Sequence, residues 1–575
     1  MTTTPPPSPD DALRAAINAA QAQASQFINT LPLRESDLQE LAGELARSPQ
    51  FRQKLAELQE RFLADWTEIL RGRDKPPENN SSDRRFSAPE WQDIPWFNTI
   101  RSIYQLHANY LEDVIGLLNP DTTSKSRLAF VCRQFVDAMS PANNPATNPQ
   151  ALKQAFQSGG KTLMHGAELF AADAARGQIS MTDETAYEVG SNIAITPGEV
   201  IFENELIQLI QYRATTARVY SRPLLIIPPF INKYYILDLQ ENNSFVRYCV
   251  EQGMTTFIVS WRNIPEELGH LTWDDYLGKG IYEAVDAVRS ISGSESINTL
   301  GFCVGGTLLS TALAVQAAEK KNQVNSLTLL ASMLDFSDTG EINVYIDESY
   351  VKQIEQQYSQ GGVLRGSQLS SAFSSLRANE LVWYFVVNNY LLGKTPRAFD
   401  LLYWNSDAAN LPGPLYAYYL RNMYLENKLR TPGALQLNGL PVDLGSIDVP
   451  SLVVATREDH IVPWKTAYLS ANLLGGSTRF LLGASGHVAG IVNPVSANRR
   501  KYWIADGDGL PPDPQIWLDS AREYAGSWWT PWMNWLKPQA GKRIRARKTL
   551  GSKRFAPLEP APGRYVRKRL AGCQT

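Results

Sequence analysis

Apolar residues recur at three- and four-residue spacing in the first part of the chain, from about residue 11 to residue 175. One such series is Leu41, Leu45, Phe51, Leu55, Leu58, Phe62 and Trp66. This period predicts amphipathic helices, which polar or proline-containing breaks at 74–82 and 141–145 interrupt. We therefore expect an all-helical N-terminal domain over residues 1–180, in which the Thr- and Pro-rich residues 1–10 are disordered.

Short apolar runs replace the helical pattern from about residue 193. The runs lie at 193–195, 200–202, 207–212, 224–230, 255–261, 297–300, 327–331, 451–455 and 479–482, and the run at 224–230 is expected to be a strand that continues into a loop. Helical stretches such as 276–290 separate several of them, and this alternation predicts a parallel sheet that is covered on both faces. We expect an α/β-hydrolase fold over residues 181–575. The pattern breaks between about 338 and 430, where we expect a lid over the active site.

Composition narrows the functional classes. The chain has 575 residues and a formal net charge of −3, so its charge gives no reason to expect nucleic-acid binding. Its four cysteines are scattered, with neither paired metal-ligand spacing nor the density of a disulfide scaffold. The first residues do not resemble a secretory signal, and no apolar run is long enough to span a bilayer. We expect a cytoplasmic protein that has no transmembrane segment and needs no metal or redox cofactor.

A candidate nucleophile lies in the segment Gly301-Phe302-Cys303-Val304-Gly305-Gly306, which an apolar run precedes and a helix-like run follows. This is the arrangement of a nucleophile elbow, a sharp strand-to-helix turn, with cysteine in place of serine. Unpaired N–H groups at the start of the helix favour a thiolate and a nearby oxyanion. Cys303 is therefore the candidate nucleophile, and the N–H of Val304 is a candidate oxyanion donor. The alternative is a buried structural cysteine in a Gly-rich turn.

A thiolate nucleophile needs a base, and the base needs an acid that orients it. In this fold the chain order is nucleophile, acid, histidine. Asp459 follows the apolar run 451–455, and His487 lies in a loop of small residues after the run 479–482. The sequence therefore predicts the set Cys303, Asp459 and His487. His460 is the alternative base, and Glu458 is the alternative acid.

Several longer stretches, in collinear order, carry a specific family pattern. They are Thr182–Gly190, Pro228–Leu239, Val259–Asn263, Gly301–Gly306, Asn410–Pro414, Arg457–Trp464, Gly483–His487 and Glu559–Val566. From about residue 83 to residue 566 the chain resembles a class I polyhydroxyalkanoate synthase, the poly(3-hydroxybutyrate) polymerase; the first 80 residues match weakly. Phe230 departs from the pattern, because other members can carry a smaller residue there, often cysteine.

The resemblance implies an activity. We expect polymerisation of (R)-3-hydroxyacyl-CoA, with (R)-3-hydroxybutyryl-CoA as the foremost substrate, into polyhydroxyalkanoate polyester with release of CoA. The acyl group would be held on Cys303, and Asp459 would either orient His487 or help to activate the substrate hydroxyl. The resemblance also implies the N–H of Ile231 as a second oxyanion donor, a homodimer, and association with cytoplasmic polyester granules. The rival functions are a thioesterase or esterase of the same fold and a non-catalytic granule-coat protein.

Weaker candidates lie in the expected lid and near the C-terminus. Arg377 is a candidate for contact with CoA phosphates, and Trp404 and His460 are candidates for contact with the substrate; ordinary salt bridges and core packing are the alternatives. The cluster around Trp528 is expected to pack the last helix onto the sheet, and contact with the polymer surface is the alternative. The chain after Trp535 is rich in Lys and Arg, with Glu559 as its single acid. Such a tail attracts anionic CoA or an anionic granule surface, or is merely solvated.

Overall fold

The chain forms two compact units in a computed structural model that describes residues 32–72, 83–118, 123–505, 507 and 509–569. Residues 1–10, which we expected to be disordered, lie outside the described residues. The first unit comprises the described residues up to Asp183 together with 371–397. The second comprises 184–370 and the described residues from Ala398 onward.

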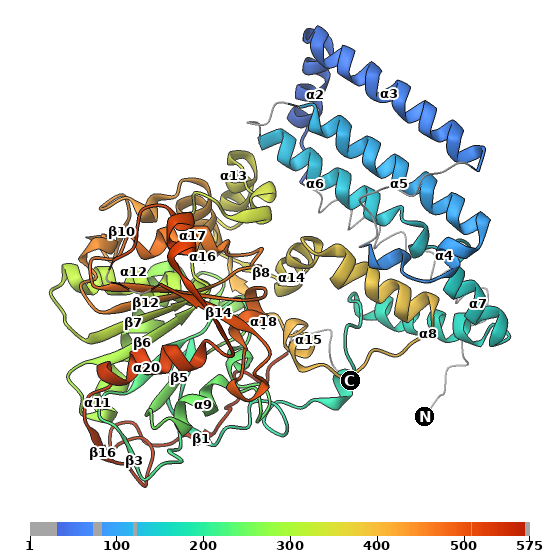
Figure 1. Ribbon diagram of the computed structural model, residues 1–575. Coiled ribbons are helices and arrows are strands. Elements are labelled where there is room, and N and C mark those ends of the chain that lie inside the picture. Colours follow the sequence, from blue (N-terminus) through green and yellow to red (C-terminus); the bar gives the residue numbers. More distant parts are fainter. Residues whose placement is uncertain (1–31, 73–82, 119–122, 506, 508, 570–575) are drawn as a thin grey trace. The chain divides into compact units, whose positions relative to one another are not determined.

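The first unit is helical, as the apolar spacing predicts. Its helices are α2 (Glu35–Arg47), α3 (Pro49–Leu70), α4 (Glu90–Asp93), α5 (Pro95–Gly116), α6 (Thr123–Ala138), α7 (Pro149–Gln157) and α8 (Lys161–Arg176). Helix α3 has a capped start, because the Ser48 hydroxyl accepts from the Phe51 N–H and Pro49 occupies the first helical position. Figure 1 shows α3, α5 and α6 lying alongside one another. A buried ion pair between Arg127 and Asp37, at 2.7 Å, joins α6 to α2.

These helices do not have the character of membrane spans. The longest, α3 and α5, have 22 residues each, and charged residues recur along both. Within the described ranges, none of the helices is at once long enough and apolar enough to cross a bilayer.

Residues 371–397 belong to the helical unit. The sequence instead predicts that they are part of the lid of the α/β domain, which was expected to span 338–430. Their π-helical turn η9 (Val386–Leu391) packs on α8. The approach is close: a Cβ on Gly166 would lie 2.0 Å from the Tyr390 carbonyl oxygen. The Tyr390 hydroxyl donates to Asp173 at 2.7 Å. An amphipathic segment buries its apolar face against whichever helices offer a matching surface, and the linear pattern does not reveal which these are.

The second unit is built on an 11-stranded sheet with the order β15-β14-β13-β12-β7-β6-β4-β5-β2-β1-β17. The strands are β1 (Gly198–Glu203), β2 (Ile207–Tyr212), β4 (Leu224–Ile227), β5 (Thr256–Trp261), β6 (Ile297–Phe302), β7 (Val324–Leu330), β12 (Ser451–Thr456), β13 (Thr478–Gly483), β14 (Lys501–Ile504), β15 (Arg522–Ala525) and β17 (Glu559–Pro560). The six strands from β13 to β5 pair in parallel, and the strands at both edges pair antiparallel. The strand predicted at 193–195 is absent from the described sheet, because Ala194 adopts a left-handed φ of 56° that a strand does not allow.

Helices cover both faces of this sheet (Figure 1). Alternate residues of each central strand enter opposite cores: Leu225 and Ile227 of β4 join one apolar cluster, and Leu224 and Ile226 join the other. The first cluster includes side chains of α11 (Glu283–Ser292), α12 (Val304–Ala318) and α17 (Trp464–Ala471). The second includes side chains of α9 (Phe245–Glu251) and α20 (Trp529–Gln539). Burial on both faces explains why the central strands read as continuous apolar runs.

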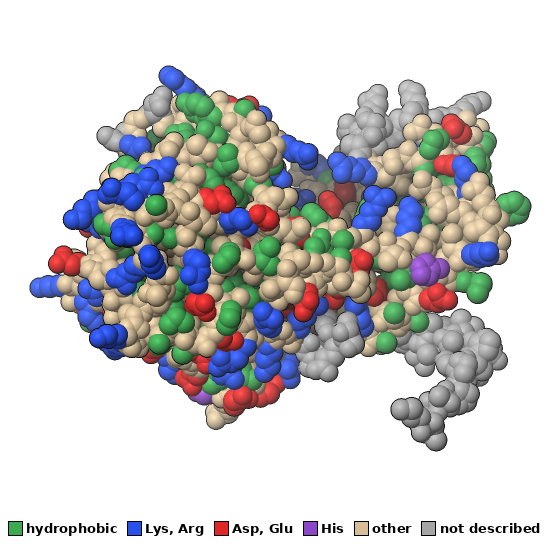
Figure 2. All heavy atoms as spheres, turned by 90° about the horizontal axis from the view of Figure 1, so that it is seen from below, with side chains coloured by type: hydrophobic (Ala, Val, Ile, Leu, Met, Phe, Trp, Pro, Cys, Tyr) green, Lys and Arg blue, Asp and Glu red, His purple; other side chains and the backbone are tan. Residues whose placement is uncertain are grey.

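The rest of the second unit consists of connections and a folded C-terminal part. Between β7 and β12 lie α13 (Glu348–Gln357), the first residues of α14 (Gly366–Ser375), α15 (Asp400–Asn405) and α16 (Gly413–Tyr419). The basic C-terminal part is folded up to Arg569 rather than merely solvated. Its strand β16 (Arg543–Arg545) pairs with β3 (Arg218–Tyr220), and β17 pairs with β1. Figure 2 shows many Lys and Arg side chains on one face of the molecule, with acidic side chains among them.

Candidate active site

Cys303 lies at a strained turn between β6 and α12. Its backbone has φ 52° and ψ −130°, a conformation that L-residues rarely adopt. Its N–H donates to the Leu330 carbonyl of the neighbouring strand β7 at 2.9 Å, and its carbonyl accepts from the Gly306 N–H at 2.9 Å. Cys303 is half-buried, whereas Cys249 is fully buried within α9. These bonds hold the sulfur at the N-terminus of α12, as the motif predicts.

The glycines around Cys303 are required by close backbone approach. A Cβ on Gly301 would lie 2.3 Å from the Gly306 Cα, and a Cβ on Gly305 would lie 2.5 Å from the carbonyl oxygens of Ile227 and Pro228. The first turn of α12 is therefore pressed against the backbone that follows β4. This contact places the backbone of Pro228, three residues before Ile231, against the turn that carries Cys303.

Asp459 and His487 meet at the ends of two parallel strands. Asp459 follows β12, and His487 is the first residue of α18 (His487–Ile491) after β13. His487 Nδ1 and Asp459 Oδ2 are 2.8 Å apart. The second carboxylate oxygen, Oδ1, accepts from the N–H groups of Ile461 at 2.9 Å and Val462 at 2.8 Å. A carboxylate that is held in this way accepts the Nδ1–H of His487 and leaves Nε2 as the reactive nitrogen.

The surroundings of His487 favour its protonated form. Burial lowers the pKa of the imidazole, but the Asp459 carboxylate and the Cys303 side chain, through charge and hydrogen bonding, raise it well above its ordinary value. The ring stacks on Phe302, with centroids 5.6 Å apart. A protonated imidazole beside the sulfur stabilises a thiolate, which is the reactive form of cysteine.

Two tryptophans hold the helix that begins at His487. The indole N–H of Trp528 donates to the Gly490 carbonyl at 2.9 Å, and that of Trp529 donates to the Ile491 carbonyl at 3.0 Å. Trp532, farther along α20, donates to the Thr328 hydroxyl of β7 at 3.1 Å. The prediction that this cluster packs the last helix onto the sheet is confirmed. In addition, the cluster fixes α18, which the sequence did not indicate.

Two backbone groups are candidates to bind an oxyanion. Val304 is the first residue of α12, where N–H groups have no acceptor within the helix. Ile231 follows β4, which is the parallel neighbour of β6, with Ile227 opposite Gly301. The Ile231 carbonyl accepts from the Ala409 N–H at 3.3 Å. Both segments lie at the same edge of the sheet, and the role of the two N–H groups as oxyanion donors stays a prediction.

The remaining candidates from the sequence have other surroundings. Glu458 is exposed, and the carboxylate that meets His487 is that of Asp459. His460 is half-buried one residue further on. Trp404 is buried, and its indole N–H donates to the Lys233 carbonyl at 2.7 Å, so it supports the loop after β4. Arg377 is exposed and belongs to the helical unit rather than to the unit that carries Cys303.

Two tyrosines near Cys303 were not singled out by the sequence. Tyr419 ends α16 and Tyr424 lies in the π-helical turn η10 (Leu420–Leu425), and their rings meet edge to face with centroids 5.1 Å apart. Burial is the main cause that raises the pKa of both phenols, and the neighbouring Cys303 raises it further. Tyr419 lies in the expected lid, and nothing in its spacing marks it as a neighbour of the sulfur.

Known proteins have similar sequences. Residues 82–249 match the family described as poly-beta-hydroxybutyrate polymerase (PhaC) N-terminus, and residues 222–494 match the alpha/beta hydrolase fold, which confirms the predicted fold class. The chain is 48% identical over 525 residues to the poly(3-hydroxyalkanoate) polymerase subunit PhaC of Cupriavidus necator, covering 90% of this chain and 89% of that protein. It is 41% identical over 502 residues to the subunit of the same name from Rhizobium meliloti, covering 86% and 81%. It is 40% identical over 493 residues to the poly(3-hydroxyalkanoate) polymerase of Methylorubrum extorquens, covering 85% and 81%. The chain therefore belongs to the poly(3-hydroxyalkanoate) polymerase family.

Proposed function

We propose that the chain polymerises (R)-3-hydroxyacyl-CoA, with (R)-3-hydroxybutyryl-CoA as the foremost substrate, into a polyester and releases CoA. The observation that carries this proposal is the position of Cys303, at a strained elbow beside the His487–Asp459 pair, in a chain of this family. A cysteine suits repeated acyl transfer, because a thiolate both attacks a thioester readily and leaves readily.

The first half of the reaction acylates Cys303. His487 takes the thiol proton, and the Cys303 sulfur attacks the carbonyl carbon of the CoA thioester. The oxyanion that forms is bound by the N–H groups of Val304 and Ile231. The intermediate then collapses: the carbon–sulfur bond to CoA breaks, and CoA leaves as a thiol with the proton that His487 held. The acyl group remains on Cys303 as a thioester.

The second half extends the polyester. The 3-hydroxyl of a second substrate loses its proton to His487 and attacks the acyl carbonyl on Cys303. A carbon–oxygen bond forms, the bond to the Cys303 sulfur breaks, and the sulfur leaves as a thiolate beside the protonated His487. The product is an ester longer by one unit, and Cys303 is ready for the next acyl group.

Asp459 acts by orienting His487 in this proposal. Its side chain has no exposed surface, and its oxygens already accept from His487, Thr456 and two backbone N–H groups. A carboxylate with its acceptor positions filled in this way is poorly placed to receive a substrate hydroxyl. This arrangement favours orientation of the imidazole over direct activation of the 3-hydroxyl.

The helical unit is the candidate for contact with the product granule and for pairing of two chains. It exposes large apolar side chains, among them Phe156 with 90%, Met164 with 67% and Trp96 with 66% of their surface accessible. Apolar surface of this kind supports association with a polyester granule in the cytoplasm and formation of a homodimer. Co-sedimentation of the chain with newly formed polymer, and its mass in solution before substrate is added, test the two proposals separately.

The test of the main proposal incubates the purified chain with (R)-3-hydroxybutyryl-CoA and follows thiol release and products together. We expect release of CoA with insoluble polyester, and loss of both in Cys303→Ala. Cys132→Ala is the matched control, because Cys132 is also half-buried but lies in the helical unit. Thiol release with only free 3-hydroxybutyrate would identify a thioesterase of the same fold instead. Thiol release that persists in Cys303→Ala would refute the covalent step.

A further inference from the structure

Lys233, two residues beyond Ile231, is buried within the electrostatic influence of Asp407, which carries the opposite charge. Lys233 and Asp407 each keep 2% of their surface accessible. Lys233 Nζ donates to the Lys568 carbonyl at 2.7 Å, and the Tyr235 hydroxyl donates to Asp407 Oδ2 at 2.9 Å. Burial lowers the pKa of Lys233 and raises that of Asp407, and each charge partly offsets the effect on the other. Charges buried to this extent are costly unless other groups compensate them.

Arg569 supplies a second cation to this pair. Its Nε lies 3.9 Å from Asp407 Oδ1, and its Nη1 lies 3.3 Å from Glu184 Oε2. Its guanidinium also lies over the Tyr403 ring, 4.5 Å from the centroid. Arg569 therefore balances two carboxylates and stacks on an aromatic ring at once, which fixes its planar group more firmly than a single exposed ion pair would.

The segment that carries Asp407 is bonded directly to the segment that carries Ile231. Asn232 and Ala408 form an antiparallel bridge, and the Ala409 N–H donates to the Ile231 carbonyl at 3.3 Å. A displacement of Asp407 therefore moves the residues that bond to Ile231 and its neighbour. The direction of the Ile231 N–H depends on this same stretch of backbone.

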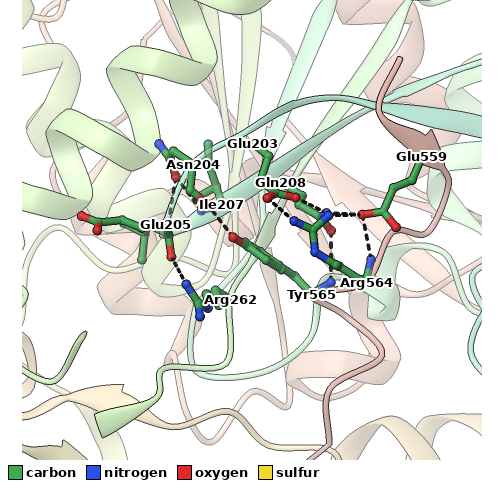
Figure 3. Close-up of polar contacts among 10 residues, drawn as sticks. Glu203, Asn204, Glu205, Ile207, Gln208, Arg262, Glu559, Arg564 and Tyr565 are labelled. Carbon is green, nitrogen blue, oxygen red and sulfur yellow. Dashed lines mark hydrogen bonds and ion pairs between the residues drawn. The ribbon is translucent and has the colours of Figure 1, made fainter. Parts of the chain in front are cut away.

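The C-terminal strap, residues 559–569, is itself anchored so that Arg569 has a defined position. Figure 3 shows Arg564 between Glu203 and Glu559; it pairs with both, at 2.8 Å in the case of Glu559. The Tyr565 hydroxyl donates to the Asn204 carbonyl at 2.7 Å, and the Tyr565 N–H donates to Gln208 Oε1 at 3.1 Å. The strap is thus pinned to β1 and β2 four to five residues before Arg569.

We propose that Arg569 is a positioning residue: by neutralising Asp407 and Glu184 it holds the loop of Ile231 in the geometry that binds the oxyanion. This inference rests on the proposed acyl transfer. It gives the C-terminal strap a role in the reaction, although the strap does not touch the reacting atoms. A small displacement of an oxyanion donor weakens binding of the transition state far more than binding of the substrate.

The test compares Arg569→Ala, Arg569→Lys and Arg554→Ala by CoA release from (R)-3-hydroxybutyryl-CoA. Arg554 is the matched control, because it belongs to the same basic part of the chain and lies over an aromatic ring, 5.2 Å from the Phe555 centroid. We expect kcat to fall on the order of tenfold in Arg569→Ala with KM little changed. Arg569→Lys should recover part of the loss, and Arg554→Ala should match the unmodified chain.

A second readout separates positioning of the oxyanion donor from general damage to the site. Alkylation of Cys303 by iodoacetamide needs the thiolate but forms no oxyanion, so its rate should be unchanged in Arg569→Ala. An unchanged kcat, or an alkylation rate that falls as much as kcat, would overturn the proposal. If Arg569→Ala does not fold, Glu184→Gln replaces it. We expect a smaller loss of kcat in Glu184→Gln than in Arg569→Ala. An unchanged kcat in Glu184→Gln would count against the proposal. Absence of CoA release from the unmodified chain would overturn the proposed function, and this inference with it.

Discussion

His487 Nδ1 lies 2.8 Å from Asp459 Oδ2, and the Asp459 side chain has no exposed surface. Two backbone N–H groups fix the other carboxylate oxygen, so the pair can meet in only one orientation. The imidazole is thereby directed with Nε2 toward the region of Cys303. The activity of Cys303 should therefore depend on both Asp459 and His487.

Asp459→Asn should lower the rate of CoA release on the order of 10³-fold, because the amide keeps the shape but no longer selects the Nδ1–H tautomer of His487. KM should change little, since the side chain is buried away from the substrate. Initial rates with (R)-3-hydroxybutyryl-CoA measure both quantities. Glu458→Gln is the control: it changes the adjacent, exposed carboxylate and should retain full activity. Equal losses in the two variants would contradict the assignment of Asp459.

His487→Gln should slow alkylation of Cys303 by iodoacetamide at pH 7 by about tenfold or more, because the raised pKa of His487 keeps a positive charge beside the sulfur in the unmodified chain. Mass spectrometry of the Cys303 peptide gives the rate directly. His270→Gln, at an exposed histidine, should alkylate at the unmodified rate. A Cys303 that reacts equally fast without His487 would show that the imidazole does not stabilise the thiolate.

Gly301→Ala should destabilise the fold by about 2–3 kcal/mol, since its Cβ would meet backbone atoms of Gly306 that cannot move away cheaply. CoA release should fall as well, because the first turn of α12 would be displaced. Urea unfolding followed by tryptophan fluorescence measures the stability. Gly278→Ala is the matched control, because no atom lies within 4 Å of its added Cβ. It should be neutral or stabilising by up to about 1 kcal/mol in its helical setting. Similar losses in both variants would contradict the close packing at Gly301.

Asp238 should make the stability of the second unit depend on pH. Burial raises its pKa to about 6, although Thr196 and Ser244 donate to it at 2.5 Å and 2.6 Å. The folded state therefore holds this proton more tightly than the unfolded chain, whose aspartates titrate near pH 4. The contribution of Asp238 to the free energy of unfolding falls as pH rises from about 4 to about 6 and is constant above that.

Asp238→Asn should remove this dependence. Between pH 4 and pH 7, the free energy of unfolding of the variant should rise by up to about 3 kcal/mol relative to that of the unmodified chain, because the pKa of Asp238 is raised by about two units. Urea unfolding midpoints at the two pH values measure the gain. Asp519→Asn, at an exposed carboxylate, should show no such gain. If the difference in free energy of unfolding between Asp238→Asn and the unmodified chain is the same at both pH values, the pKa of Asp238 is not raised.

The sequence was sufficient for the central sheet and for the order of the candidate site. Strand β4 lies at the start of the predicted run 224–230, and β6 lies where the sequence predicts a strand that leads into the turn of Cys303. The glycines on both sides of Cys303 mark a turn that only a close backbone approach explains. Asp459 and His487 each follow a predicted strand, and the ends of parallel strands meet at one edge of a sheet. The catalytic roles of these residues stay predictions until the variants are measured.

Local patterns failed where a partner far along the chain decides the conformation. The run 193–195 is apolar like a strand, but Ala194 takes a left-handed conformation and its N–H donates to the carbonyls of Asp238 and Leu239. Trp404 is an aromatic residue of the expected lid, yet its indole bonds to the loop after β4. In both cases, hydrogen bonds to the loop after β4 decide the conformation of the residue.

The sequence by itself determined which segments form helices and strands and in which order the reactive side chains follow them, because these properties depend on residues a few positions apart. Only the tertiary structure decided that 371–397 joins the helical unit, that Tyr419 lies near Cys303, and that Arg569 balances Asp407. Burial of apolar surface and compensation of buried charge act between residues separated by hundreds of positions. No periodicity in the chain records which distant surface or charge will be the partner.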